Sequence, residues 1–488
     1  MPEGGLPPRV QEFLDRHPGT ARVDGPGVVL EPGPHPAVLV TARDEADLRA
    51  WTWPQARSAV VAVLLGPGAA ALTLDPGGDL PLVELRTRRL ARHRWCVLRF
   101  AGDVDVAEVL TRVARQTVWH DRGRLPVRTG GRGAALRLDE RVLNPTGFRT
   151  DVTGPVRDLE ALPRRVDRAL VGDLREARGV VAAGPVGAEG AERVVALALA
   201  GVPVVAPAVD PGAVGPRLAA ALAAPVDLAD DLAREEHSVV LRRAALDAHA
   251  AGWAGRPQPS VSVVVATRRA DMVEHALAQV GRQRGVDRLE LVLAPHGFDL
   301  DPARARALLP AHVDLQVRPQ AADVLFGDVL QAAYLASGGD VVMKMDDDDW
   351  YSPETVLDLL RARAYSGAEL VGTPVGWLYV AARDVTVQQR YSSEVAARFV
   401  AGGTMMVDRP VLREAGGFRS VRRYVDAQLL GAVLATGAGV YRIHALDYVL
   451  RRNPSGHTWQ LDADALLAGE KVLATWPGLR PSRLMELG

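Results

Sequence analysis

A single cysteine, Cys96, stands among the 488 residues of the chain. This scarcity excludes an intrachain disulfide framework and any zinc site built on cysteines, and it agrees with a reduced, cytosolic setting. The chain also lacks an excess of positive or negative charge, because its 58 Lys and Arg residues are balanced by 59 Asp and Glu residues. The net charge of −1 gives no general attraction to nucleic acid or to an anionic membrane. We therefore expect a cytoplasmic protein that binds no nucleic acid and is at most peripheral to a membrane.

Long apolar runs are missing as well. The longest, 194–209, is broken by one glycine and two prolines and is shorter than the ~18 residues that a membrane span needs. The first residues lack the basic and then apolar pattern of a signal peptide, so we expect no transmembrane segment. Aromatic residues make up only 5% of the chain, so its cores must consist mainly of valine, leucine and alanine. Lysine is almost absent, since Lys344 and Lys471 are the only two.

The length predicts about three domains, and the composition along the chain suggests where they divide. Residues 1–118 alternate short apolar runs with polar helical stretches, a pattern typical of βα units around a mostly parallel sheet. Residues 119–155 are rich in arginine and glycine and are interpreted as a connector. Residues 156–250 return to a Rossmann-like α/β pattern. The Gly/Pro-rich stretch 251–260 is interpreted as a linker to a C-terminal domain at 261–488.

The C-terminal domain shows the clearest α/β pattern. Apolar runs predict strands at 261–266, 289–293, 313–317 and 341–345, and helical stretches separate them. Such a doubly wound sheet binds its ligands at the carboxyl ends of the strands. We therefore look for the functional residues immediately after these runs.

Four consecutive aspartates, 346–349, follow the fourth predicted strand directly. Two carboxylates 4 Å apart repel each other by about 4 kcal/mol at an effective dielectric constant near 20. The strand holds the first aspartate in place, so the run needs a cation, and oxygen ligands of this kind suit Mg²⁺ or Mn²⁺. Because residues i and i+2 of an extended segment point the same way, Asp346 and Asp348 are predicted to share the metal. By the same rule Lys344 lies on the side of Asp346, where it moderates the repulsion when no metal is bound.

A simpler interpretation of the acidic run is an N-terminal cap for the helix predicted at 352–365. A cap needs one acidic side chain and not four, so the metal site is the favoured interpretation.

Several segments resemble, in this order along 259–459, the family 2 glycosyltransferases of the GT-A fold. They are VSVVVATRR, VVMKMDDDDWYSP, GGTMMVDRPVLREAGGF, the triplet Tyr424-Val425-Asp426 and LRRNPSGHTW. The resemblance implies a GT-A (nucleotide-diphospho-sugar transferase) domain preceded by the Rossmann-like α/β region. It also implies a metal-dependent inverting glycosyltransferase, with a nucleotide-sugar donor and a glycan or other hydroxyl acceptor. The predominance of arginine over lysine suggests a bacterial source and bacterial glycan synthesis.

The resemblance assigns roles to individual residues. Asp426 is the catalytic base that accepts the proton of the acceptor hydroxyl. The implied donor-binding residues are Thr267, Arg269, Asp346, Asp347 and Arg451. The acceptor-binding residues are Asp349 and Trp350, and the ligands of Mn²⁺ or Mg²⁺ are Asp346, Asp348 and His457.

The sequence departs from the family pattern in three places. The family's Pro-Thr-x-Asn is replaced at 266–269, the acidic pair after its second strand is replaced at 295–297, and Val425 stands where a glutamate is usual. The identity of the nucleotide therefore stays open. Two alternatives remain, a nucleotidyltransferase of similar fold and a non-catalytic glycan-binding scaffold. Residues 156–250 also resemble the C-terminal lobe of GT-B glycosyltransferases, but they lack its donor-binding positions, so we expect a packing role there.

Overall fold

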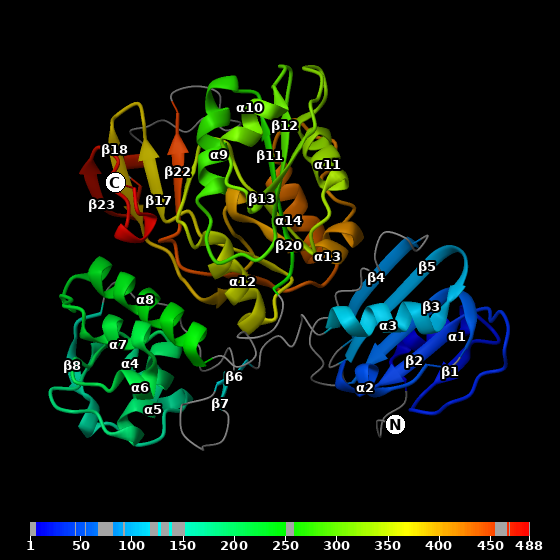
Figure 1. Cartoon of the computed structure of the whole chain (residues 1–488), viewed down its shortest axis with the longest axis horizontal. Coiled ribbons are helices and arrows are strands. Elements are labelled where there is room, and N and C mark those ends of the chain that lie inside the picture. The colour runs from blue at the N-terminus through cyan, green and yellow to red at the C-terminus, as the bar shows by residue number, and fades with distance from the viewer. Residues whose placement is uncertain are drawn as a thin grey trace.

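The computed structural model describes residues 6–43, 45–53, 55–66, 82–90, 93–117, 125–127, 136–138, 152–249, 258–453, 466–467 and 469–487. The chain forms an N-terminal, a middle and a C-terminal domain (Figure 1). The N-terminal and middle domains lie apart from each other, each beside the C-terminal domain. Within the described ranges, no helix is both long enough and apolar enough to cross a membrane.

The N-terminal domain is a five-stranded sheet in the order β1-β2-β3-β5-β4. Its elements are α1 (Pro8–Arg16), β1 (Ala21–Val23), β2 (Val38–Ala42), α2 (Glu45–Ala50), β3 (Arg57–Leu65), β4 (Leu82–Leu90), β5 (His93–Asp105) and α3 (Val106–Thr117). The prediction of a mostly parallel sheet is wrong for two of the four strand pairings, because β5 runs antiparallel to both β3 and β4. Only two residues separate β4 from β5, and so short a connection can join only antiparallel strands.

Among the described residues, this domain contacts the C-terminal domain at β4 and at Arg94. Strand β4 packs against helix α13 (Arg409–Glu414). The Arg94 guanidinium lies 3.0 Å from the Glu369 carboxylate, and both side chains are buried. Of the predicted connector, the structure describes a two-stranded ladder of β6 (Leu125–Val127) and β7 (Leu136–Leu138).

The middle domain confirms the predicted α/β pattern on a small scale, with three parallel strands in the order β10-β9-β8. Its elements are β8 (Gly154–Asp158), η2 (Leu159–Ala161), α4 (Arg168–Leu174), β9 (Ala177–Val181), α5 (Ala188–Leu199), β10 (Val204–Val205), α6 (Pro211–Val214), α7 (Pro216–Ala223) and α8 (Asp231–His249). Helix α8 packs against α5 and α7. Thirteen of its 19 residues are buried, including charged ones, so more than one of its faces is covered.

The C-terminal domain contains an eight-stranded sheet in the order β13-β12-β11-β14-β20-β16-β21-β19, and a second sheet in the order β15-β22-β17-β18-β23. The strands are β11 (Val261–Thr267), β12 (Leu289–Pro295), β13 (Val313–Val317), β14 (Val341–Lys344), β15 (Trp350–Tyr351), β16 (Leu370–Gly372), β17 (Trp377–Val380), β18 (Val385–Gln389), β19 (Val395–Ala396), β20 (Met406–Asp408), β21 (Val440–Arg442), β22 (Tyr448–Arg452) and β23 (Val472–Pro477). The helices, besides α13, are η3 (Ala270–Met272), α9 (Val273–Gly281), α10 (Pro302–Ala307), α11 (Phe326–Ala336), α12 (Thr355–Ser366), η4 (Gly402–Thr404), α14 (Val425–Ala435) and η5 (Arg483–Met485).

Strands β13, β12, β11 and β14 are parallel, which confirms the four predicted strands and the doubly wound pattern. Every residue of β11 is buried, as expected for a central parallel strand that is covered on both faces. The chain runs outward from β11 through β12 to β13 and then returns to the other side of β11 as β14. The strand order therefore reverses between β11 and β14, and in sheets of this type ligands bind at that point, beyond the carboxyl ends of the strands.

Candidate functional site

The acidic run 346–349 lies at this reversal point. Strand β14 ends at Lys344, and only the buried Met345 separates it from the first aspartate. At the other end, β15 pairs with β22, which places Trp350 opposite Val449 and holds the segment in place. The side chain of Asp346 is 34% exposed, whereas the other three aspartates are buried. Only the first carboxylate of the run is thus substantially open to solvent.

Lys344 links this first aspartate to Asp426. Its Nζ lies 2.5 Å from Asp346 Oδ1 and 3.2 Å from Asp426 Oδ1, and its side chain is 3% exposed. Burial disfavours the ammonium charge, but the two carboxylates outweigh this effect and raise the pKa of Lys344 above its ordinary value. Asp426 itself lies in the first turn of α14 with 39% of its side chain exposed. Burial raises the pKa of the Asp426 carboxyl, and Lys344 opposes that rise.

The turn η4 lies against both of these carboxylates, and two glycines make this possible. A Cβ on Gly402 would lie 2.1 Å from Asp426 Oδ2, and a Cβ on Gly403 would lie 3.0 Å from Asp346 Oδ2. The Gly402 carbonyl oxygen also lies 3.5 Å from Lys344 Nζ. These contacts account for the Gly-Gly pair at the start of the GGTMM segment.

Arg269 forms hydrogen bonds with two of the other aspartates. It follows β11, and its Nη1 donates to Asp348 Oδ2 at 2.7 Å, while its Nε donates to Asp347 Oδ2 at 3.1 Å. Thr267 Oγ1 also donates to Asp347. Asn453 Nδ2 donates to Asp348 Oδ2 at 2.7 Å. The sequence-predicted residues Thr267, Arg269, Asp347 and Asp348 therefore meet, and in this arrangement they bond to one another.

Asp349 is a buried anchor between the acidic run and β22. Its carboxylate accepts a hydrogen bond from Tyr448 Oη at 2.6 Å and another from the backbone N–H of Arg451 at 2.8 Å. Burial, followed by the charges of Asp346 and Asp348, raises the pKa of Asp349 well above its ordinary value. Its side chain is 3% exposed, so its position holds β22 in place and does not present the carboxylate to solvent.

Trp350 supports the side chain of Arg451. The guanidinium carbon of Arg451 lies 5.4 Å from the centre of the indole ring, within cation–π range. His275 and Tyr379 meet the same ring edge-on, each with centroids 5.6 Å away. Arg451 Nε is buried without a hydrogen-bond partner, and no carboxylate among the described residues pairs with this guanidinium. The arginine therefore keeps hydrogen-bonding capacity for an anion.

The site fits a divalent cation in charge and donor chemistry. The carboxylates of 346–349 and Asp426 outnumber the two cations beside them, Lys344 and Arg269. Burial raises the pKa of Asp348 above its ordinary value, and neighbouring carboxylates add to this effect. Carboxylate oxygens are the ligands that Mg²⁺ and Mn²⁺ prefer. A metal held by Asp346 and Asp348 would compete with Lys344 and Arg269 for these oxygens. His457, the third predicted ligand, lies outside the described residues.

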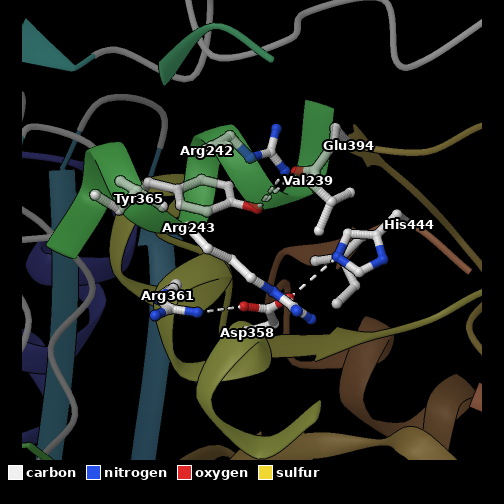
Figure 2. Close-up of a pocket in the computed structure, with 10 residues that line it drawn as sticks. Val239, Arg242, Arg243, Asp358, Arg361, Tyr365, Glu394 and His444 are labelled. Carbon is white, nitrogen blue, oxygen red and sulfur yellow. Dashed lines mark hydrogen bonds and ion pairs between the residues drawn. The ribbon is translucent and has the colours of Figure 1, made fainter. Parts of the chain in front are cut away.

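A second charged cluster, which the sequence reasoning did not predict, joins α8 to the C-terminal domain (Figure 2). Arg243 donates from Nη2 to Asp447 at 2.8 Å and from Nε to Asp358 of α12 at 2.9 Å. Arg361 of α12 donates to the same Asp358 at 2.6 Å. Arg242 pairs with the buried Glu394. Helix α8 itself carries polar residues on every side, a pattern typical of a solvated helix, so its sequence gives no signal that these charged side chains are buried.

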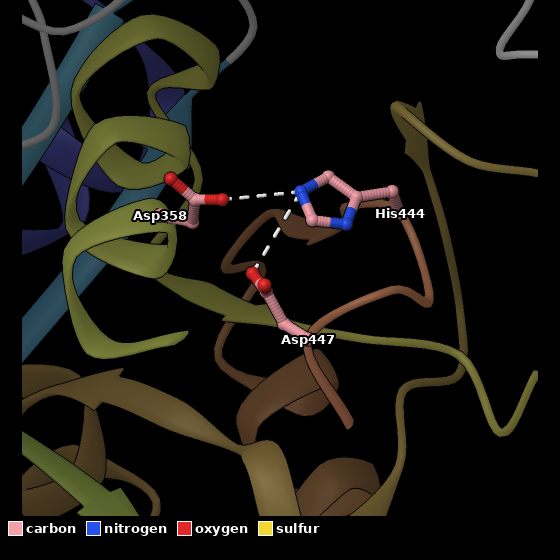
Figure 3. Close-up of side chains that lie close together, drawn as sticks. All are labelled: Asp358, His444 and Asp447. Atoms are coloured by element: carbon pink, nitrogen blue, oxygen red, sulfur yellow. Dashed lines mark hydrogen bonds and ion pairs between the residues drawn. The ribbon is translucent and has the colours of Figure 1, made fainter. Parts of the chain in front are cut away.

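Within this cluster, Asp358, His444 and Asp447 place their ligand-type atoms within 4.8 Å of one another (Figure 3). The trio has the donor types of a metal site. However, Arg243 and Arg361 already neutralise the carboxylates, and the cavity beside them has a volume of about 10 Å³, enough for about one water molecule. Burial disfavours the charge of His444, but both carboxylates outweigh it and raise the pKa of the imidazole. The cluster is best described as a buried ionic contact between domains.

Neither a protein-family model nor a curated protein sequence matches the chain. Over part of its length the chain is similar to solved glycosyltransferase structures. One is the mannosyltransferase PcManGT of Pyrobaculum calidifontis in complex with GDP-Man and Mn²⁺, with 18% identity and a TM-score of 0.33, covering 41% of this chain and 58% of that one. Another is S. aureus TarS 1–349 in complex with UDP-GlcNAc, with 12% identity and a TM-score of 0.35, covering 41% and 62%. The chain thus spans about three fifths of these proteins, and similarity at this level says nothing about its substrate.

Proposed function

We propose that the chain is an inverting glycosyltransferase that moves a sugar from a nucleotide-diphosphate donor to an acceptor hydroxyl. The observation that supports this most is the meeting of four segments that are far apart in the sequence. Arg269, the run 346–349, Asp426 and Arg451 all lie around the reversal point of the sheet. The sequence resemblance predicted these residues, and their contacts link them into one site.

Asp426 is the base in this proposal. The acceptor oxygen attacks the anomeric carbon, and its proton passes to the Asp426 carboxylate. The bond between the anomeric carbon and the diphosphate oxygen breaks, and the nucleoside diphosphate leaves with the electron pair. An ionised carboxylate is sufficient for such a step. The 39% exposure of the Asp426 side chain allows an acceptor to reach it.

Arg269 and Arg451 are the proposed ligands of the donor phosphates, because a guanidinium matches phosphate oxygens in pairs. Arg451 is available, since it has no carboxylate partner among the described residues. Arg269 is 33% exposed and is oriented by Thr267 and Asp347, which bond to each other and to it. Asp349 and Trp350, which the resemblance assigns to the acceptor, contact β22 and Arg451, so in this proposal they support the donor side. Mn²⁺ or Mg²⁺ held by Asp346 and Asp348 would supply Lewis-acid stabilisation of the leaving diphosphate.

Release of nucleoside diphosphate from a panel of nucleotide sugars, GDP-mannose and UDP-GlcNAc included, tests the proposal when it is measured with and without Mn²⁺. With the active donor, Asp426→Asn is expected to lower turnover by roughly 10²- to 10⁴-fold. Glu274→Gln is the matched control, because Glu274 also lies in the first turn of a helix and its side chain is 64% exposed. We expect the control to keep wild-type turnover.

The same assay separates the alternatives. Release of pyrophosphate from a nucleoside triphosphate, with a sugar phosphate as co-substrate, would indicate a nucleotidyltransferase. Glycan binding without turnover of any donor would indicate a scaffold. Wild-type turnover in Asp426→Asn would show that Asp426 is not the base.

A further inference from the structure

We propose that Lys344 is a positioning residue that ties Asp346 to Asp426 and thereby sets the distance between the donor side of the site and the base. The inference rests on the proposed function and adds a residue to it. Neither the acidic run nor the family resemblance requires a lysine at this position. The reasons lie in the contacts of its ammonium group.

The ammonium group is surrounded by three oxygens from separate segments. They are Asp346 Oδ1 at 2.5 Å, Asp426 Oδ1 at 3.2 Å and the Gly402 carbonyl oxygen at 3.5 Å. The lysine is anchored at its backbone as well, because its N–H donates to the Met405 carbonyl at 2.9 Å. With 3% of its side chain exposed, the group cannot exchange these partners for water. The position of Asp426 relative to β14 therefore depends on this one cation.

The choice of lysine supports a specific role. Arginine supplies nearly all the positive charge of the chain, and the only other lysine, Lys471, is exposed. An ammonium is a compact charge with three donors on one atom, whereas a guanidinium is a wide planar fork. The turn packs closely against both carboxylates, because a Cβ on Gly402 would overlap Asp426 Oδ2 and a Cβ on Gly403 would lie only 3.0 Å from Asp346 Oδ2. A guanidinium in place of the ammonium would displace the turn or the base.

The same ammonium has a second consequence for a metal at Asp346. It holds an oxygen that a divalent cation would need, and two positive charges near one carboxylate repel each other. Removal of Lys344 should therefore strengthen metal binding while it disorders the base. A merely structural residue would weaken both properties together, so the opposite signs identify a positioning role.

The test compares Lys344→Met, Lys344→Arg and the matched control Lys471→Met in the full chain. Mn²⁺ binding without nucleotide is measured by electron paramagnetic resonance, and kcat and KM are measured with the active donor. For Lys344→Met we expect Mn²⁺ to bind on the order of tenfold more tightly. We expect its kcat to fall roughly 100-fold, the effect of displacing a reacting group by about 1 Å, with little change in donor KM. Lys344→Arg should keep the Mn²⁺ affinity and lose kcat, and Lys471→Met should match the wild type.

Each outcome bears on the inference. Wild-type kcat in Lys344→Met or in Lys344→Arg would overturn it while leaving the proposed function intact. Weaker Mn²⁺ binding together with a lower kcat in Lys344→Met would also overturn it. If Lys344→Met does not fold, the kcat of Lys344→Arg tests the inference alone: a loss of kcat supports it, and wild-type kcat overturns it. A wild-type chain that neither binds Mn²⁺ nor turns over any donor would refute the proposed function, and this inference with it.

Discussion

Replacement of Arg243 by methionine tests how much the contact between α8 and the C-terminal domain contributes to the free energy of unfolding. The guanidinium is 8% exposed and lies 2.8 Å from the carboxylates of both Asp358 and Asp447, which are buried as well. Burial disfavours its charge, but the carboxylates outweigh this and raise the pKa of Arg243. Methionine fills much of the same space and leaves two buried carboxylates without their shared partner. Arg361 and His444 compensate this loss only in part.

Removal of one partner from a buried ion pair typically costs about 3–5 kcal/mol, a large share of the roughly 5–15 kcal/mol that stabilises a domain. With an m-value of about 3 kcal/mol per M of urea, the unfolding midpoint should fall by about 1 M or more. Tryptophan fluorescence can follow the transition, because Trp377 is buried and stacks on Trp476 at 5.5 Å. Val239 of α8 belongs to the same apolar cluster, so the contribution of this tryptophan pair reports on the interface.

The control is Arg304→Met, whose partner is Glu274. These two side chains are 73% and 64% exposed, so the loss should stay below about 1 kcal/mol. A double-variant cycle with Asp447→Asn should show a double variant that is little less stable than either single one, since both changes break the same contact. If Arg243→Met costs no more than the control, the contact between domains contributes nothing and the reasoning fails.

Three further predictions concern the base, its helix and the buried histidine. Gly402→Ala should lower kcat at least about tenfold without changing donor KM, because its Cβ would lie 2.1 Å from Asp426 Oδ2 and must displace the base; unchanged steady-state kinetics would contradict this. Tyr424 has a φ of 61°, a left-handed conformation that is unfavourable for a residue with a Cβ, so Tyr424→Gly should raise the free energy of unfolding by about 1 kcal/mol. A lower urea midpoint in this variant would show that the conformation is not strained. The pKa of His444 is raised, so its stabilising charge is fully present below the ordinary value of about 6.5 and is lost as the pH rises through the folded-state pKa. The urea midpoints of the wild type and of His444→Gln should therefore converge as the pH is raised into the alkaline range. A difference between the two midpoints that does not change with pH would show that the charge of His444 does not stabilise the fold.

The positions of the site residues could be predicted only where neighbours in the sequence determine them. Lys344 and Asp346 are two residues apart on an extended segment, so their shared side followed from strand geometry, and the structure shows the contact. The same rule suggested a common metal site for Asp346 and Asp348. In the structure Asp346 contacts Lys344, whereas Asp348 contacts Arg269, which lies just after the end of β11. A local rule cannot anticipate a partner that arrives from another strand.

The α/β pattern of the C-terminal domain and the acidic run at a strand end could be predicted from consecutive residues, because hydrophobic periodicity and local charge depend on neighbours in the sequence. The cation that each carboxylate contacts, and the contact between α8 and the C-terminal domain, could be found only from the folded chain. Arg243 and Asp447 are 204 positions apart, and Asp349 and Tyr448 are 99 apart. Contacts of this kind depend on how helices and sheets pack, and the charge balance of the whole chain, which is nearly neutral, gives no sign of them.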